Sequence, residues 1–379
     1  MIAFALIPVF IWIYLLVARG MFWRMRERDD LGEPLFKPET WPSVVAVVPA
    51  RNEADVISET LGSLLQQDYP GDLRIILVDD QSTDGTGEVA LLKSLDVTRR
   101  ATIISGQPRP AGWTGKLWAM QQGLEKAVQQ DAPDYLLFTD ADIAHAPDNV
   151  RRLVARAETG RLVLVSLMAK LYCKSFAEKL LIPAFVFFFD MLFPFGWSND
   201  PARQTAAAAG GCMLARRDAL LAAGGLGAIK GKIIDDCALA RIMKRQGPIW
   251  LGLTMRATSV RPYGDMNEIR RMIARSAYAQ LAYSPLLLTG TVLGMVLVYA
   301  AAPFLAVFGE GIVRLGGIAA WAMMALAFQP MLGFYRLSPF WGLAMPVIGA
   351  LYTVFTIDSA LQFWRGKGGM WKGRAQAMA

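Results

Sequence analysis

Three clusters of acidic side chains in the middle of this 379-residue chain have the types and spacing needed for chemistry. In the first, Asp140 and Asp142 come at the end of the apolar run YLLFTD. Alternate residues of an extended chain share a face, so both carboxylates can bind one hard cation, Mg²⁺ or Mn²⁺. Such a cation would bridge a diphosphate and stabilise the charge of a departing nucleotide. A plain polar loop is the alternative.

The second cluster is the stretch DDQSTDG, which contains Asp79, Asp80 and Asp84. Three acids within six residues repel one another unless they are solvated, used as caps or bound to a partner. Capping of the following helix is a sufficient explanation for Asp84. Asp79 and Asp80 end a predicted strand, where a base or a ribose can use a carboxylate acceptor. We therefore predict that these two acids bind a nucleoside.

The third cluster is Asp235 and Asp236, which precede an amphipathic helix in the stretch KIIDDCALA. Favourable charge at a helix N-terminus is a sufficient structural explanation. The functional alternative is a general base, because an adjacent like charge and partial burial raise the pKa of one carboxyl toward neutrality. Such a base would take the proton from an acceptor hydroxyl.

Small and basic residues near these acids have two interpretations each. Gly210 and Gly211 follow four alanines and either let the backbone approach a ligand or allow tight packing. Lys116, in WTGKLWA, either meets a phosphate or starts a helix. His145, the only histidine, is either a further metal ligand or a solvated loop residue.

Alternating strands and helices position these residues. Short apolar, β-branched runs predict strands at 43–50, 73–80, 101–106 and 135–140, and helical spacing predicts helices at 53–67, 84–95 and 114–128. This order predicts an α/β fold with a Rossmann-like, mostly parallel sheet, whose strands end at the edge where ligands bind. There is no GxGxxG after the first strand and no Walker loop, so hydride transfer and ATP hydrolysis lack their usual signals.

Apolar segments flank this region. Hydrophobic residues make up 54% of the chain and are concentrated at its two ends. We expect a transmembrane anchor at 1–20, a globular domain at 40–275, transmembrane helices within 285–364 and a basic tail at 365–379. Asp358 in the last span needs a partner. Four full spans would leave the basic tail outside, against the positive-inside rule, so one span is re-entrant or interfacial, or the rule is overridden. The stretch 176–197 contains two prolines and an aspartate, which favours an interfacial helix over a buried core helix.

Charge and cysteine usage limit the partners and the compartment. The net charge is +7, but no stretch combines basic and aromatic residues as nucleic-acid binders do, so we expect no nucleic acid. The basic residues lie next to apolar spans and are expected to contact anionic lipid head groups. Cys173, Cys212 and Cys237 form no CxxC pair and are expected to be reduced. These features predict a multi-pass protein of the inner membrane with its globular domain in the cytoplasm.

The ordered stretches VVPARNE, ILVDDQSTDGT, TDAD, GGCMLARR and IDDCALA resemble the family 2 glycosyltransferases with a GT-A fold, from about residue 42 to 265. The stretches GWTGKLWAMQQG, LIPAFVFFFDMLFPF, AAAAGGCML and RSAYAQLAYSPLLL resemble the ceramide-glucosyltransferase-like branch and, within it, the bacterial hopene-associated glycosyltransferases called HpnB.

This resemblance implies a role for each matching residue. Contact with a uracil-type base is implied for Pro49, Arg51 and Glu53, and nucleoside binding for Asp80 with Asp79 beside it. Metal and diphosphate binding are implied for Asp140 and Asp142. Gly211 is implied to line the sugar and acceptor region, together with Gly210 and Asp235. Asp236 is implied to be the catalytic base of inverting members.

The chain departs from the family in one motif. Processive and ceramide-type members carry QxxRW, whereas this chain has only the arginine, Arg275, which is expected to meet the diphosphate. The resemblance thus implies inverting transfer of a single sugar from a UDP-sugar to a hydroxyl of a hopanoid or related isoprenoid lipid, with a divalent cation as cofactor and no obligate protein partner. A polyprenyl-phosphate or sphingolipid-type acceptor, or a non-catalytic membrane protein with a nucleotide-binding fold, are the alternatives.

Overall fold

The structure is a computed structural model that describes residues 2–31, 38–95, 101–130, 132–371 and 374–375. Their contacts divide the chain into two compact units. We call residues 27–172, 197–261 and 370–379 the sheet unit, and residues 1–26, 173–196 and 262–369 the helical unit. The sequence places one boundary at 275, whereas contacts assign 262–275 to the helical unit. Lys372 of the predicted basic tail lies outside the described residues.

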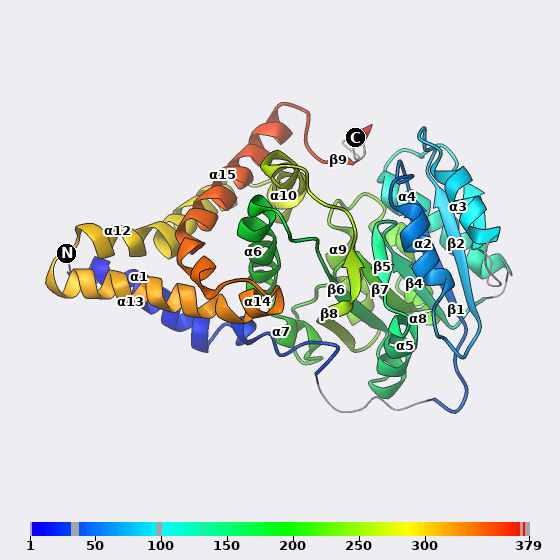
Figure 1. Cartoon of the computed structure of the whole chain (residues 1–379), viewed down its shortest axis with the longest axis horizontal. Helices are drawn as coiled ribbons and strands as arrows, with labels where there is room; N and C mark the ends of the chain where they lie inside the picture. Colours follow the sequence, from blue (N-terminus) through cyan, green and yellow to red (C-terminus); the bar gives the residue numbers. More distant parts are fainter. Residues whose placement is uncertain (1, 32–37, 96–100, 131, 372–373, 376–379) are drawn as a thin grey trace. The chain divides into compact units, whose positions relative to one another are not determined.

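The sheet unit is built on one eight-stranded mixed sheet with the order β3-β2-β1-β4-β7-β6-β8-β5 (Figure 1). Its strands are β1 (Val44–Ala50), β2 (Leu73–Asp79), β3 (Ala101–Ser105), β4 (Tyr135–Thr139), β5 (Ile143–His145), β6 (Leu164–Lys170), β7 (Cys212–Arg216) and β8 (Ile249–Ser259). The four strands β3, β2, β1 and β4 are parallel, as predicted. β7 runs antiparallel to β4 and β6, and β5 runs antiparallel to β8.

Helices cover both faces of this sheet. Because side chains alternate along a strand, Val44, Ala46 and Val48 of β1 face one layer, and Val45 and Val47 face the other. The first layer contains α2 (Ile57–Leu65), α3 (Thr86–Leu95) and α5 (Asn149–Thr159), and the second contains α4 (Gly115–Gln130), α8 (Arg217–Ala222) and α9 (Asp235–Lys244). All four predicted strands and all three predicted helices of this region are present. The remaining elements of this unit are η2 (Leu226–Ile229), and β9 (Met370–Trp371) paired with β10 (Arg374–Ala375).

The helical unit contains three helical segments that are long and apolar enough to cross a membrane, at Pro285–Phe308, Gly311–Phe334 and Pro339–Trp364. They comprise α11 (Pro285–Met295), the π-helical η3 (Val296–Ala300), α12 (Ala301–Phe308), α13 (Gly311–Ala327), α14 (Gln329–Phe334), η4 (Pro339–Ala344) and α15 (Met345–Trp364). These segments match the three predicted C-terminal spans closely.

The predicted N-terminal anchor is a shorter helix, α1 (Ile2–Val17). Its 16 residues span about 24 Å at 1.5 Å per residue, less than the roughly 30 Å of a bilayer core. α1 packs on α13, and the buried Trp12 donates its indole N–H to the carbonyl oxygen of Val298 at 2.9 Å. The short η1 (Phe22–Arg24) follows it.

The predicted interfacial helix is a core helix of the helical unit, which was the alternative explanation. α6 (Phe176–Leu192) begins with a capping box made by Ser175 and Glu178. An interfacial helix would leave its apolar side uncovered. Instead, the buried Phe187 packs edge-to-face against Phe22 and Phe328, and Tyr352 of α15 donates a hydrogen bond to the carbonyl oxygen of Leu181. α7 (Phe195–Asn199) follows at the boundary of the two units.

Asp358 has the partner that its place in an apolar helix requires. Arg270 of α10 (Met266–Gln280) donates a hydrogen bond to its carboxylate at 2.5 Å, and Gln362 donates another at 2.7 Å. The next residue of α15, Ser359, accepts from the backbone N–H of Tyr278. Polar contacts therefore hold α10 against α15.

Candidate active site

The predicted acids gather at one edge of the sheet. β1, β2 and β4 are parallel, so the residues that follow them lie together. β7 runs antiparallel to β4 and pairs Cys212 with Thr139. The two glycines that precede β7 therefore lie at this same edge of the sheet. The topology thus brings Asp140 and Gly211 together, and the backbone N–H of Asp140 points to the Gly211 carbonyl oxygen at 3.4 Å.

The loops after β1 and β2 are tied to each other by hydrogen bonds. Asn52 accepts from the backbone N–H of Thr83 at 2.9 Å, and Asp84 accepts from Ala54 at 3.1 Å and from Thr86 at 3.1 Å. Asp84 is thus the helix cap that the sequence predicts. Asn52 and Gln81 hold left-handed backbone conformations, with φ of 50° and 56°. Such conformations are uncommon for residues other than glycine and cluster at functional sites.

Buried Arg51 organises the predicted nucleoside-binding acids. Its guanidinium donates to the backbone carbonyl oxygens of Asp80 and Gln81 and lies 3.8 Å from the Asp80 carboxylate. The Asp80 side chain has no exposed surface, whereas Asp79 is partly exposed. Pro49 is buried within β1. The expected contacts of Pro49 and Asp80 with the base stay predictions.

Lys116 joins two of the three acidic clusters. It lies at the start of α4, and its Nζ is 2.7 Å from Asp140 and 3.5 Å from Asp235. These two carboxylates and that of Asp236 raise the pKa of Lys116 against the opposing effect of burial. Lys116 is therefore a charged ammonium group between the predicted metal site and the predicted base.

Asp236 has the environment of a general base. Its carboxylate accepts from the backbone N–H of Gly210 at 3.0 Å and from that of Cys237 at 2.7 Å. Burial and the neighbouring charge of Asp235 raise the pKa of Asp236 to about 6, although Lys116 and the two N–H donors act against this rise. A Cβ on Gly210 would lie 3.1 Å from the Lys116 ammonium, so this glycine leaves room for the charged groups.

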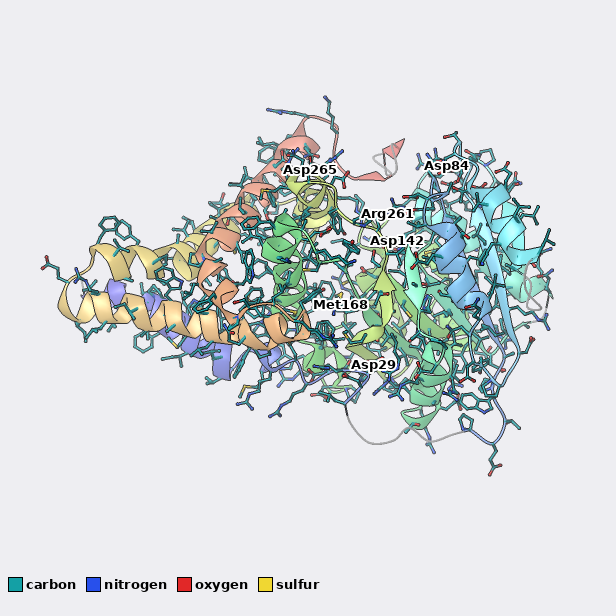
Figure 2. The ribbon with its side chains drawn as sticks, in the orientation of Figure 1. Asp29, Asp84, Asp142, Met168, Arg261 and Asp265 are labelled. Atoms are coloured by element: carbon teal, nitrogen blue, oxygen red, sulfur yellow. The ribbon has the colours of Figure 1, made fainter. Side chains whose placement is uncertain are left out.

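Asp142 faces a second cation, which the sequence analysis missed. Its carboxylate accepts from Ser259 at 3.1 Å and lies 4.0 Å from Arg261, just beyond the end of β8 (Figure 2). The same guanidinium bonds Glu53 and lies 3.4 Å from Asp55. Burial and the charge of Asp140 raise the pKa of Asp142. Nothing in the local sequence distinguishes Arg261 from the other arginines, because its partners are more than a hundred residues away.

Asp140 and Asp142 fit a divalent cation that is shared with a ligand. Among the residues described, no three His, Cys, Asp or Glu side chains are arranged as a metal site of protein groups alone. Mg²⁺ is typically held by one or two carboxylates plus phosphate oxygens, so a pair is sufficient. Burial, and then the charge of Asp140, raise the pKa of Asp142, so a bound cation would favour the ionised form of this carboxyl.

Two other predicted residues, His145 and Arg275, lie outside the cluster of acids. His145 is buried, and its two ring nitrogens are hydrogen-bonded to Thr139 and Asn149. In this structure it is therefore neither a metal ligand nor a solvated loop residue. Arg275 is an exposed residue of α10 in the helical unit, and its role at a diphosphate stays a prediction.

Part of the chain matches a known protein family. Residues 45–222 match the family described as Glycosyl transferase family 2. The chain is 29% identical over 121 residues to an N-acetylglucosaminyltransferase of Mesorhizobium japonicum, covering 32% of this chain and 27% of that protein. It is 29% identical over 203 residues to a 4,4'-diaponeurosporenoate glycosyltransferase of Staphylococcus aureus, covering 52% of this chain and 50% of that protein. The chain thus spans half or less of these two curated relatives.

One solved structure resembles the chain over nearly its full length. The mannosyltransferase PcManGT of Pyrobaculum calidifontis, solved in complex with GDP-Man and Mn²⁺, superimposes with a TM-score of 0.56 at 19% identity and covers 96% of this chain and 99% of that one. This likeness shows that the fold is of the GT-A type, and residues 45–222 within it match Glycosyl transferase family 2.

Proposed function

We propose that the protein is a membrane-bound inverting glycosyltransferase that moves a single sugar from a UDP-sugar to a hydroxyl of a hopanoid or related isoprenoid lipid. The observation that carries this proposal is the carboxylate of Asp236, which is tuned toward a pKa of about 6 and lies beside Lys116 and the Asp140 loop. A base is thereby placed next to groups suited to a diphosphate.

The chain's own residues support a single displacement. Asp236 accepts the proton of the acceptor hydroxyl as the acceptor oxygen forms its bond to the anomeric carbon of the sugar. The bond between that carbon and the diphosphate oxygen breaks on the opposite side, and the nucleoside diphosphate leaves with the electron pair. Lys116 lies where its ammonium group can meet the negative charge of this leaving group. A divalent cation, when bound at Asp140 and Asp142, would supply further electrostatic stabilisation of the diphosphate.

The helical unit supports a lipid acceptor. Its three candidate spans would hold the protein in the bilayer in which such an acceptor is dissolved. The relative from Staphylococcus aureus is named for a lipid-like acceptor, 4,4'-diaponeurosporenoate. The sequence resemblance to hopene-associated members adds the hopanoid class. The proposed orientation places the sheet unit in the cytoplasm, where nucleotide-sugars are made.

Sugar transfer by the purified protein tests this function. The full chain is reconstituted in lipid nanodiscs with a bacterial isoprenoid lipid extract, MnCl₂ and UDP-glucose or UDP-N-acetylglucosamine, and glycolipids are detected by mass spectrometry. We expect a lipid heavier by one hexose or one N-acetylhexosamine, together with release of UDP. Absence of both transfer and Mn²⁺-dependent UDP binding, with every donor and with a polyprenyl-phosphate acceptor as well, would exclude the proposal.

The pH dependence of transfer should report the ionisation of Asp236. The base is active when deprotonated, so kcat/KM is expected to fall as the pH decreases through about 6. The charge of Asp235 contributes to the raised pKa, so Asp235→Asn should move this acidic limb to lower pH. The measurement is kcat/KM between pH 4.5 and 8.5 for both proteins. An acidic limb that stays in place in Asp235→Asn would contradict the assignment of the base.

A further inference from the structure

A chain of hydrogen bonds behind the candidate site starts at buried His145. The His145 Nε2 lies 3.0 Å from the Thr139 hydroxyl, and its Nδ1 lies 2.8 Å from the amide nitrogen of Asn149. The Thr139 hydroxyl in turn lies 2.8 Å from the carbonyl oxygen of Gly211. His145, Thr139 and Asn149 are all at most 5% exposed. No step of the proposed sugar transfer uses these three side chains.

The direction of each hydrogen bond follows from simple counting. The Gly211 carbonyl oxygen can only accept, so the single hydroxyl proton of Thr139 is donated to it. Thr139 must then accept from His145, which places the ring proton on Nε2. The unprotonated Nδ1 accepts from the amide group of Asn149, in agreement with the orientation of that side chain. Burial lowers the pKa of His145 to about 4, so the ring keeps this neutral form near neutral pH.

This chain of hydrogen bonds reaches two parts of the candidate site, the Asp140 loop and the glycine pair that contacts Asp236. Thr139 is the residue before Asp140, and Gly211 is the residue after Gly210, whose N–H binds the Asp236 carboxylate at 3.0 Å. The Gly211 carbonyl oxygen also faces the N–H of Asp140. The Gly210–Gly211 backbone therefore contacts both acids: the N–H of Gly210 binds the acid proposed as the base, and the carbonyl oxygen of Gly211 faces the backbone of the acid proposed to bind metal.

We propose that His145 and Thr139 are positioning residues that hold the Gly210–Gly211 backbone against the Asp140 loop and thereby keep Asp236 in line with the donor. The inference rests on the proposed function, because it assigns these residues a part in the same transfer. It assigns His145 the role of a fixed hydrogen-bond donor to Thr139 instead of the role of a metal ligand. The catalytic consequence is expected in turnover, since neither residue reaches the surface where the donor binds.

A pair of substitutions at Thr139 tests the hydroxyl with little change in volume. Thr139→Ser keeps the hydroxyl, whereas Thr139→Val keeps the shape and removes it. We expect Thr139→Val to lower kcat by about 10-fold to 100-fold with the donor KM within about threefold of the unchanged protein, because a small misplacement of reacting groups is costly for turnover. Thr139→Ser should stay within about threefold in both. His145→Gln retains an N–H donor at the Nε2 position and should lose less turnover than His145→Leu.

A control variant separates positioning from general destabilisation. Thr254 is another buried threonine whose hydroxyl makes a hydrogen bond, to Asp29, five residues before the end of β8. Thr254→Val should lower the melting temperature without the selective loss of kcat. If Thr139→Val matches Thr254→Val in turnover, or if Thr139→Ser fails to rescue it, the proposed role is excluded.

Hydrogen exchange gives a result that does not depend on activity. The amide of Gly210 and the peptide segment 206–212 should exchange at least severalfold faster in Thr139→Val than in Thr139→Ser, because the Gly211 carbonyl loses its anchor. Should the unchanged protein transfer no sugar, the proposed function fails, and the exchange rates still decide whether the hydrogen-bond chain fixes this loop. Equal exchange in the two variants would overturn the inference even if the enzyme is active.

Discussion

Asp236→Asn is expected to reduce kcat for sugar transfer by about 10²- to 10⁴-fold, the usual contribution of a general base. The N–H groups of Gly210 and Cys237 bind different oxygens of the Asp236 carboxylate, so asparagine can keep one of these two hydrogen bonds. We expect the donor Kd to change much less than kcat, because Asp236 is proposed to act on the acceptor hydroxyl. The measurement pairs single-turnover kinetics with calorimetric titration of UDP in the presence of MnCl₂. A non-catalytic protein that only binds nucleotide would have no turnover to lose.

The same substitution should stabilise the fold. A carboxyl with a raised pKa is harder to ionise in the folded protein than in the unfolded chain, by about 1.4 kcal/mol for each pKa unit. The ionised Asp236 therefore lowers stability at neutral pH, and replacing it removes this penalty. We expect the melting temperature of Asp236→Asn to exceed that of the unchanged protein at pH 8. This gain should shrink as the pH falls below 6, where the folded carboxyl becomes protonated, and should disappear only below about pH 4, where the unfolded chain is protonated as well.

Asp218→Asn is the matched control. Asp218 lies in the first turn of α8 as Asp236 lies in the first turn of α9, but its side chain is 77% exposed. Loss of this helix N-terminal charge is expected to cost a few tenths of a kcal/mol to about 1 kcal/mol in stability and to leave turnover unchanged. Equal effects of the two substitutions would show that Asp236 acts only as helix N-terminal charge.

Asp142→Asn is expected to reduce Mn²⁺-dependent UDP binding by at least about 10-fold and turnover by about 10²-fold or more, because one of the two carboxylates proposed to hold the cation loses its charge. The hydrogen bond from Ser259 can persist on the asparagine oxygen. UDP titrations with and without EDTA separate the cation-dependent part of binding from the rest. Removal of the cation from the unchanged protein should mimic the substitution.

Asp68→Asn controls for the general loss of an acidic residue. Asp68 is an exposed carboxylate of the same unit that pairs with Arg151, away from the acidic edge. It should bind UDP and Mn²⁺ as the unchanged protein does. UDP binding by Asp142→Asn that is as sensitive to EDTA as that of the unchanged protein would refute a cation at this position and leave Asp142 as a partner of Arg261 alone.

The parallel half of the sheet and the acids at its edge could be predicted from the local amino-acid pattern. Alternating strands and helices force β1, β2 and β4 to run the same way, so the residues after them must meet. The positions of Asp79, Asp140 and Asp142 could be predicted because each lies at or just after the end of a strand that the local sequence pattern indicates. The apolar spans were predictable for a similar reason, since each is one continuous run.

The groups that these acids face could not be predicted, because they depend on how the folded chain brings distant segments together. Lys116, Arg261 and His145 act on the site through partners brought together by β4, β7 and β8, and the pairing of antiparallel strands distant in the sequence leaves no local pattern. The two prolines and the aspartate of the stretch 176–197 favoured an interfacial helix, whereas α6 is buried by its neighbours in the helical unit, which are distant in the sequence. Local sequence specifies backbone direction and side-chain chemistry, whereas a pKa or an ion pair depends on distances that only the folded chain sets.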